Sequence, residues 1–178
     1  MRRIGFIIGT LLLSLTAYAA NETFYMSIPG IKGESQDKTY AGWIPLTSFS
    51  DGFMSTGRAG GGATGRGAGR LVCQALQVVK QLDSSSPAIT AAVATGQVFH
   101  EIDLVAVATG ERPLTFLKFA LHNAVISSVT FGGDSSTSAR VETLSVTAPK
   151  VDVTYWPQQP DGTLGSPLTA TVDCFSFN

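Results

Sequence analysis

The sequence has very few of the side chains from which catalytic and metal-binding sites are built. It contains two His and two Cys among its 178 residues, and only 14% of the residues are charged. No Gly-x-Ser-x-Gly, His-Glu-x-x-His or paired-cysteine metal motif occurs. We therefore expect that the protein is not an enzyme and that it uses no metal and no cofactor.

The two histidines stand alone in segments of alternating apolar and polar residues. His122 is expected to be a hydrogen-bonded strand residue. At strand spacing, His100 shares a face with Ile102, while Glu101 and Asp103 point to the opposite face. This spacing separates the imidazole of His100 from both carboxylates and argues against acid-base catalysis.

The formal net charge of the chain is −1. Proteins dedicated to nucleic acids carry a marked basic surplus, so we expect no nucleic-acid partner. The composition is 44% hydrophobic, which is typical of a globular chain that can bury a core. Its length fits one domain.

The first nineteen residues have the three parts of a secretory signal peptide. Two arginines stand near the start, an apolar run covers residues 4–15, and Ala17 and Ala19 form an A-x-A site. We expect cleavage between Ala19 and Ala20. The alternative, a membrane anchor, requires about 20 apolar residues, and this run is shorter, so no stable anchor is expected.

Removal of residues 1–19 leaves a single domain over residues 20–178, with 10 basic and 13 acidic residues. The leader predicts an exported protein, either periplasmic or secreted. In an oxidising compartment an even cysteine count favours a disulfide, here between Cys73 and Cys174. Two buried free thiols remain the alternative.

Alternation at period two dominates residues 113–157 and predicts half-buried antiparallel strands. The apolar residues expected to share a face are Leu117, Phe119 and Leu121; Val125, Val129 and Phe131; Leu144, Val146 and Ala148; and Val151, Val153 and Tyr155. The parity of these positions changes across Pro149 and Lys150, which predicts a bulge or a strand break. One strand with loose patterning is the alternative.

Further strands are expected over residues 24–28, 43–49, 71–79, 98–108 and 168–177. Pro45 makes the second of these an edge strand. A single short helix is expected after Ser86, a good N-cap, with Pro87 in its first turn and Gly96 at its C-terminal end. It should pack on the sheet through Ile89 and Val93. The predicted fold class is mainly β.

A glycine-rich segment covers residues 57–69. It lacks the Gly-Lys-Ser/Thr ending of a phosphate-binding loop and leads into a predicted strand instead of a helix. A long flexible arm that contacts a partner is the better interpretation. The residues of this candidate assembly loop are Gly57, Arg58, Gly60, Gly61, Gly62, Gly65, Arg66, Gly67 and Gly69.

Taken together, these segments resemble the haemolysin-coregulated protein (Hcp) family, the tube-forming component of bacterial type VI secretion. The residues that carry the resemblance are Ile31–Ser35, Asp37–Thr39, the glycine-rich segment, Lys80, Asp83, Ser86–Pro87, Ser127–Ser128, Gly132–Gly133, Glu142, Val151–Tyr155, Pro157–Gln158 and Asp161–Gly162. The combination of KGES-x-DKT with a late Y-x-P-Q-x-x-DG is fairly specific.

The resemblance implies a compact antiparallel β-barrel with one short helix that self-associates into six-membered rings, which stack as a hollow tube. It also implies secretion machinery and small effector proteins as partners. The signal peptide departs from the family pattern and suggests an exported variant, and the segment after Pro167 lacks the family's usual ending. The alternative is an exported, monomeric β-barrel binding module that holds a ligand or a host surface.

Overall fold

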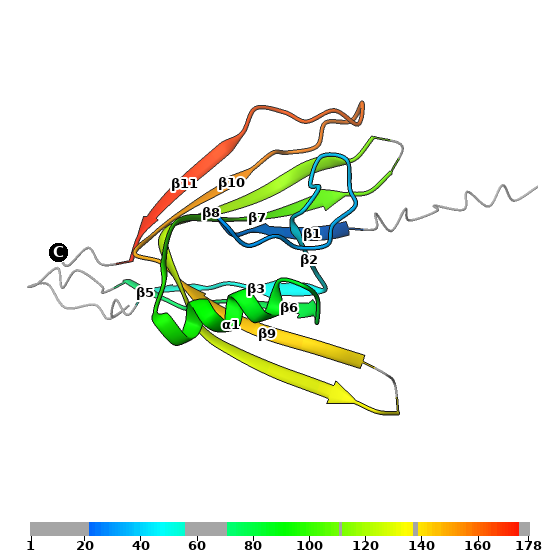
Figure 1. Cartoon of the computed structure of the whole chain (residues 1–178). Helices are drawn as coiled ribbons and strands as arrows, with labels where there is room; N and C mark the ends of the chain where they lie inside the picture. Colours follow the sequence, from blue (N-terminus) through cyan, green and yellow to red (C-terminus); the bar gives the residue numbers. More distant parts are fainter. Residues whose placement is uncertain (1–21, 56–70, 111, 137–138, 175–178) are drawn as a thin grey trace, which may run out of the picture.

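The computed structural model describes residues 22–55, 71–110, 112–136 and 139–174 (Figure 1). The predicted signal peptide, the cleavage point between Ala19 and Ala20, and the glycine-rich segment over residues 57–69 lie outside the described residues. Within them the fold is mainly antiparallel β with one short helix, which confirms the predicted fold class. The elements are β1 (Glu22–Ser27), β2 (Ile44–Leu46), β3 (Ser48–Ser50), β4 (Phe53–Ser55), β5 (Leu71–Cys73), β6 (Leu76–Gln81), α1 (Ser86–Thr95), β7 (Val98–Ala108), β8 (Leu114–Asp134), β9 (Ala139–Thr147), β10 (Lys150–Tyr155) and β11 (Leu168–Asp173).

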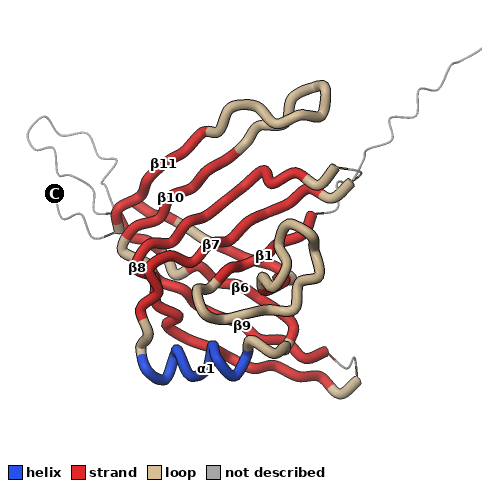
Figure 2. Tube along the Cα trace, turned by 45° about the horizontal axis from the view of Figure 1, so that its top comes forward, coloured by secondary structure: helices blue, strands red, loops and turns tan. Residues whose placement is uncertain are grey.

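The strands form two layers that share one long strand, β8 (Figures 1 and 2). The upper layer in Figure 1 runs β2-β1-β7-β8-β10-β11, and the lower layer runs β8-β9-β6-β3. Only Thr47 separates β2 from β3, and its N–H donates to the Val79 carbonyl of β6 at 2.7 Å. The chain thus passes from the edge of one layer to the edge of the other and closes the barrel.

The two layers enclose an apolar core. Its largest fully buried apolar side chains are Met26, Ile44, Leu76, Ile89, Ile102, Leu104, Leu121, Ile126, Leu144 and Val78. They come from six strands and the helix, so these elements share one core. Burial of one such side chain stabilises the fold by about 1.5–3 kcal/mol.

β7 and β8 bend together where the sheet passes from one layer to the other. On β7 the buried residues Phe99 and Ile102 are three positions apart instead of the two that strand alternation gives, and on β8 the same holds for Leu121 and Ala124. Asn123 has φ 51°, a left-handed conformation that Asn tolerates better than most residues. The bend shifts the core-facing positions from Phe99 to Ile102 and Leu104 on β7, and from Leu121 to Ala124 and Ile126 on β8.

This bend overturns two expectations. His100 is exposed while Ile102 is buried, so the two residues do not share a face. Val125 is only half-buried, whereas its neighbours Ala124 and Ile126 face the core. Strict alternation was wrong here because it assumed a straight strand.

A second irregularity lies in β8 between Ile126 and Ser128, where the register to β9 shifts. It returns odd-numbered side chains to the core side, and Val129 packs against the core as predicted. Phe131 follows at the same parity but is 52% exposed. The β8–β9 hairpin therefore projects beyond the core, as the long yellow arrows in Figure 1 show.

Two of the predicted strands are each divided in two in the structure. Residues 71–79 form two strands, β5 and β6, because Gln74 turns away to donate its N–H to the Gly52 carbonyl at 2.8 Å. Residues 43–49 likewise divide into β2 and β3 at Thr47. β2, which contains Pro45, has β1 as its ladder partner and lies at the edge as predicted. The break near Pro149 is confirmed, since β9 ends at Thr147 and β10 begins after it.

The helix α1 begins one residue earlier than the sequence predicted. Its N-cap is Ser85, while Ser86 is the first helical residue and turns its hydroxyl into the interior. Gly96 ends the helix at φ 62°, as expected. Ile89 is fully buried and Val93 packs against the core, so the predicted docking face is confirmed.

Candidate assembly surface

A buried ionic network joins β6, β9 and the start of α1. Lys80 and Glu142 are both fully buried, and Lys80 Nζ lies 2.9 Å from Glu142 Oε2 and 2.8 Å from Asp83 Oδ1. The Ser86 hydroxyl accepts from Lys80 Nζ at 3.1 Å and donates to Glu142 Oε2 at 2.5 Å. One cation therefore fixes two strands and the first turn of the helix.

The pKa of Asp83 depends on its partners in this network. Burial by itself raises the pKa of Asp83, but hydrogen bonds from Lys80 and Ser85 and the charge of Lys80 bring it below its ordinary value of 3.8. Since Lys80 and Glu142 have no solvent-accessible side-chain surface, a substrate has no route to them. These residues position the helix and carry no site for chemistry.

The KGES-x-DKT motif folds into a loop that packs back on β2. A Cβ on Gly33 would lie 2.4 Å from the Trp43 carbonyl oxygen, so only glycine fits this close approach. Asp37 Oδ1 accepts the backbone N–H groups of the residues two and three positions later at 2.8 and 3.0 Å. Glu34 Oε1 accepts the Ser84 N–H at 2.9 Å and ties the loop to the start of α1. The motif is thus a structural connection.

His122 bridges two carboxylates on the outward face of the upper layer. Its Nε2 lies 2.8 Å from Asp152 Oδ2 on β10, and its Nδ1 lies 3.2 Å from Glu101 Oε2 on β7. The Thr171 hydroxyl of β11 donates to Asp152 Oδ1 at 2.6 Å. His122 is a hydrogen-bonded strand residue as predicted, and the cluster links four neighbouring strands.

Asp103 extends this polar face. Its Oδ2 lies 3.0 Å from Lys118 Nζ, while its buried Oδ1 has no hydrogen-bond partner among the described residues. Burial raises the pKa of Asp103, and the hydrogen bond and charge of Lys118 oppose that rise only in part. In the described part of the chain, no group of three or more His, Cys, Asp or Glu side chains is arranged to hold a metal ion.

The edge strand β11 presents an open ladder. Among the described strands it pairs with β10 alone. The Cys174 N–H donates to the Pro149 carbonyl at 2.8 Å, which fixes the phase of the alternating antiparallel hydrogen bonds. The N–H groups of Thr169 and Thr171 therefore point away from β10. Such an edge is a template for a strand of another chain.

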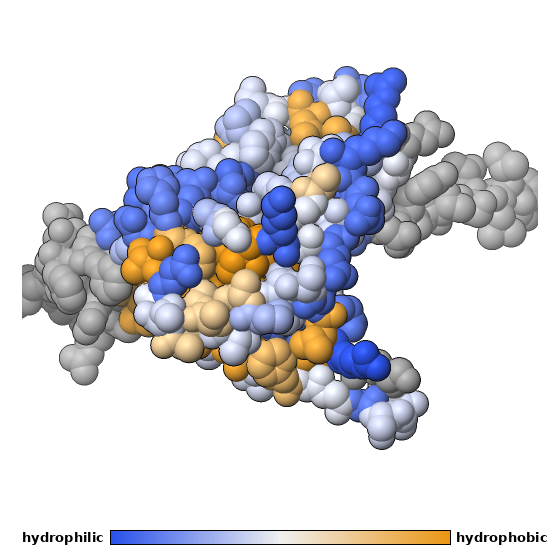
Figure 3. All heavy atoms as spheres, viewed as in Figure 1, coloured by the Kyte–Doolittle hydropathy of each residue, from blue (hydrophilic) through white to orange (hydrophobic). Residues whose placement is uncertain are grey.

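Exposed large hydrophobic residues lie in several separate places on the surface. They are Phe53, Met54 and Val72 on β4 and β5, Tyr155 and Leu168 on β10 and β11, Phe131 on the β8–β9 hairpin, and Leu82 and Val98 near the helix. In Figure 3, hydrophobic residues lie around α1 and near the connection from β10 to β11. Phe53, Met54 and Val72 lie together on the paired strands β4 and β5, and such a group suits a protein contact better than single exposed side chains do.

The β4–β5 ribbon carries the predicted disulfide at its base. Cys73, the last residue of β5, is joined to Cys174, which directly follows β11, with Cα atoms 5.6 Å apart. The same ribbon leads into residues 56–70 and so into the predicted arm, which lies outside the described residues. The disulfide thus places the root of the arm beside the end of the open edge.

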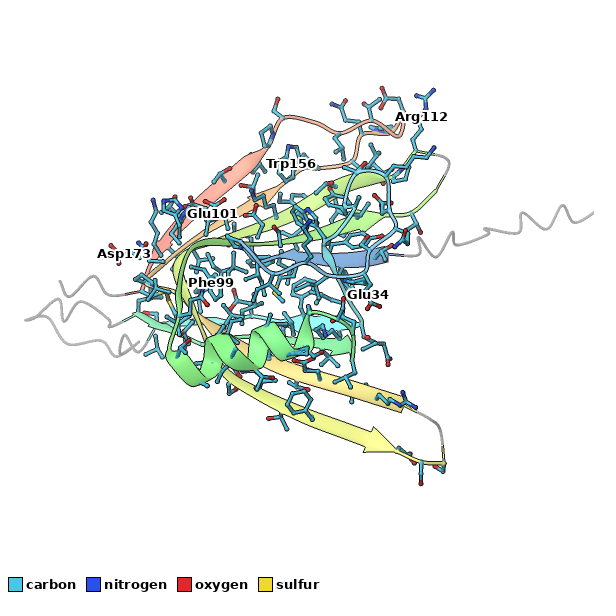
Figure 4. The ribbon with its side chains drawn as sticks, viewed as in Figure 1. Glu34, Phe99, Glu101, Arg112, Trp156 and Asp173 are labelled. Atoms are coloured by element: carbon cyan, nitrogen blue, oxygen red, sulfur yellow. A yellow bond between two sulfur atoms is a disulfide. The ribbon has the colours of Figure 1, made fainter. Side chains whose placement is uncertain are left out.

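A shallow cleft of about 230 Å³ lies at the opposite end of the upper layer. It is lined by Glu22, Ala108, Leu114, Phe116, Tyr155, Trp156, Gln158 and Leu164. In Figure 4, Trp156 and Arg112 lie toward this end, and Asp173 lies toward the disulfide end. Neither this cleft nor the open edge was predicted from the sequence, because both depend on which strands pair, and the pattern of a single strand does not specify its partners.

These features define a class of protein. Lys80 and Glu142 are sealed inside the barrel, while the β4–β5 ribbon exposes apolar side chains and β11 exposes an open ladder. Such an arrangement suits a structural protein that associates through its edges, and the described part of the chain presents no cluster that fits catalysis.

The comparisons with known proteins agree with this class. The family described as "Type VI secretion system effector, Hcp" matches residues 25–155. Protein hcp1 of Pseudomonas aeruginosa is 32% identical over 139 residues, which cover 78% of this chain and 85% of that protein. A solved type six secretion system protein superposes with a TM-score of 0.80 at 22% identity, covering 86% of this chain and 96% of that one. Hcp1 from Salmonella typhimurium gives 0.69 at 22% identity, covering 86% and 94%.

The chain belongs to the Hcp family, whose members are structural, secreted tube proteins of type VI secretion. The resemblance found in the sequence is therefore confirmed, and so is the function as a tube subunit of this system. Among the described residues, no helix has the length and hydrophobicity to cross a membrane.

Proposed function

We propose that this chain self-associates into six-membered rings, that the rings stack into a hollow tube, and that the tube carries small effector proteins. Membership of the Hcp family supports the tube. The observation that carries the contact between copies is the open ladder of β11, whose outward N–H groups at Thr169 and Thr171 need acceptors. A contact between two different surfaces of each copy closes a ring, and such rings stack.

We also propose that the protein works outside the cytoplasm. The leader over residues 1–19 directs export, cleavage falls between Ala19 and Ala20, and the mature chain is periplasmic or secreted. The glycine-rich segment over residues 57–69 then supplies a further contact between copies. Effector proteins and the secretion machinery are its partners. The intact mass of the exported chain reports the cleavage point directly.

Electron microscopy of the purified mature chain tests the ring, together with sedimentation velocity over a range of concentrations. We expect annular particles of uniform size and a mass of six copies. A species that remains monomeric at high concentration contradicts the proposal. The contact itself is tested by Thr169→Pro, which removes one outward N–H and leaves the bonds from β11 to β10 in place.

The matched control is Thr169→Val, which deletes the same hydroxyl but keeps the N–H. The Thr169 hydroxyl lies 3.0 Å from that of Thr154, so both variants lose this exposed contact. Rings in the Val variant and monomers in the Pro variant support pairing through β11. Rings in both variants show that copies meet through another surface.

The cleft beside Trp156 favours a second function, a monomeric binding module for a host surface or a ligand. Its apolar walls and the polar groups of Glu22 and Gln158 suit a small ligand, although its volume of about 230 Å³ is below that of most ligand pockets. This alternative predicts a monomer that binds a ligand saturably and loses binding when the cleft is altered by Trp156→Ala. Ring formation without an effect of Trp156→Ala on assembly contradicts it.

A further inference from the structure

The two ribbons that project toward one end of the barrel are weakly held by the rest of the sheet. In the described part of the chain, β4 and β5 pair only with each other, and β11 pairs only with β10. Strands with a single ladder partner open locally at low free energy, and their ends open first. Both ribbons are therefore free to move unless something other than the sheet fixes them.

The Cys73–Cys174 disulfide is the link that fixes them. It joins the last residue of β5 to the residue after β11, across 101 positions of sequence. Cys174 packs against the core, and its N–H donates to the Pro149 carbonyl at the corner between β9 and β10. The bond therefore anchors the β4–β5 ribbon and the end of β11 at the same point.

The disulfide lies between the exposed apolar residues of the β4–β5 ribbon and the open ladder of β11. Phe53 is the ladder partner of Cys73, and Met54 and Val72, which are 52% and 39% exposed, follow on the same ribbon. On the other side lies the open ladder of β11. A second copy that contacts both ribbons binds more tightly when they already have a fixed relative position. Otherwise binding has to order the ribbons, and this ordering lowers the affinity.

We propose that closure of the Cys73–Cys174 disulfide switches the chain from a monomer to an assembling subunit, so that copies associate only after export. This inference rests on the proposed function, because it concerns the same contact between copies. In the reducing cytoplasm the two thiols stay free and the ribbons move independently. Outside it the disulfide forms and completes the contact surface.

The chemistry needs a disulfide-containing oxidant. One thiolate, at Cys73 or Cys174, attacks the disulfide of the oxidant and forms a mixed disulfide, and the second thiolate then displaces the oxidant's sulfur. The two thiols lose two protons and two electrons, and the oxidant is reduced to its dithiol form. Glutathione disulfide supplies the same chemistry in a test tube.

The experiment compares the mature chain with and without the disulfide at equal concentration. The chain has no other cysteine, so a reductant acts on this pair alone. We expect the oxidised chain to form rings by sedimentation velocity and microscopy. Reduction, confirmed by thiol titration, should raise the concentration needed for half-assembly at least about tenfold. Glutathione disulfide should restore the rings.

Two further measurements separate a contact effect from unfolding. The double variant Cys73→Ser with Cys174→Ser should stay monomeric in either redox state, with an unchanged far-ultraviolet circular dichroism spectrum at 25 °C. Hydrogen exchange should quicken in β4, β5 and β11 on reduction, while the amides of β6 and β9 keep their protection. Loss of the β-sheet spectrum on reduction overturns the proposal, since the bond would then maintain the fold.

The outcomes distinguish this inference from the function on which it rests. Rings from both the oxidised and the reduced chain overturn the switch and leave the tube intact. Monomers from both overturn the tube and the switch together. Rings from the oxidised chain alone, with ribbon-confined hydrogen exchange, support both.

Discussion

The two ends of this barrel are stabilised in different ways. At the helix end, Lys80 and Glu142 are sealed inside and tie two central strands to α1. At the ribbon end, β11 has one ladder partner, and a covalent bond from Cys73 to Cys174 connects it to β5. The comparison shows that a buried ionic network holds the helix end, whereas the ribbon end combines the open ladder of β11 with the exposed Phe53, Met54 and Val72 of the β4–β5 ribbon.

This division suits a subunit of a larger assembly. A surface that pairs with another copy has to leave donors and hydrophobic residues exposed, and these groups weaken the isolated chain. The helix end compensates with a buried core and with the ion pairs of Lys80 to Glu142 and Asp83, although Glu142 Oε1 has no described hydrogen-bond partner. If the division is real, substitutions at the helix end should change stability most, and substitutions at the ribbon end should change association.

The largest effect is expected from Lys80→Met. It leaves the carboxylates of Asp83 and Glu142 buried without their cation, and removal of one partner of a buried ion pair costs about 3–5 kcal/mol. Urea denaturation of the monomer measures the loss. Lys32→Met makes the same change at an exposed position and should alter stability by less than about 0.5 kcal/mol.

A double variant tests whether the loss comes from an unpaired charge. Lys80→Met together with Glu142→Leu should be more stable than Lys80→Met alone, because the second change removes one of the stranded carboxylates. If the loss of stability in the double variant equals the sum of the two single losses, each side chain contributes by packing alone. The contrast with the ribbon end would then be a difference in burial and not in charge.

The second effect is expected from the disulfide. Loss of the bond frees a loop of 101 residues in the unfolded chain, and removal of native disulfides typically costs about 2–4 kcal/mol. Thermal unfolding of Cys174→Ser against the oxidised wild-type chain measures it. Hydrogen exchange should place the loosened amides at the ribbon end. Uniform loss of protection across the barrel would contradict the comparison.

A third, smaller effect is expected at the KGES loop. Gly33→Ala brings a Cβ within 2.4 Å of the Trp43 backbone oxygen, and overpacking of this kind costs about 1–3 kcal/mol. Gly110→Ala is the control, since a Cβ there meets no atom within 4 Å and the backbone is not left-handed. Urea midpoints that match for the two variants would show that the loop yields without strain.

Much of this fold could be predicted from residue patterns, and the errors have physical reasons. The alternation over residues 113–157 identified antiparallel strands, and Pro149 marked a real break. The pattern failed at Asn123, where a left-handed residue lets two strands bend together, so Val125 was assigned to the wrong face. Local periodicity contains no information about a bend that two strands share.

The candidate surface was less predictable. The cysteine count pointed to the pair that the structure joins, because the chain contains only these two cysteines. The exposure of Leu168 and Tyr155 was not foreseen, since both belong to segments that read as half-buried strands. Tyr155 and Leu168 are ladder partners at the end of β10 and the start of β11, and this position depends on strand pairing, which the alternation does not specify.

The smallest expected effect is a pH dependence of opposite sign at two carboxylates. The folded-state pKa of Asp83 lies below 3.8, so its stabilising contribution is present above pH 3.8 and is lost as the pH falls through that lower pKa. The folded-state pKa of Asp103 lies above 3.8, so the folded chain takes up a proton there before the unfolded chain does. Acidification toward pH 3.8 should therefore gain stability through Asp103 and then lose it through Asp83.

Urea denaturation at constant ionic strength between pH 6 and pH 3 measures the two contributions. Asp103→Asn should remove the gain seen on acidification above pH 3.8, and Asp83→Asn should flatten the loss below it. Equal slopes in all three proteins would contradict the assignment. The signs differ because hydrogen bonds and the charge of Lys80 outweigh burial at Asp83, whereas burial outweighs the contact with Lys118 at Asp103. Hydrogen bonds from Thr171 and His122 lower the pKa of Asp152 on the open sheet as well, so the sign at each carboxylate follows from its own partners.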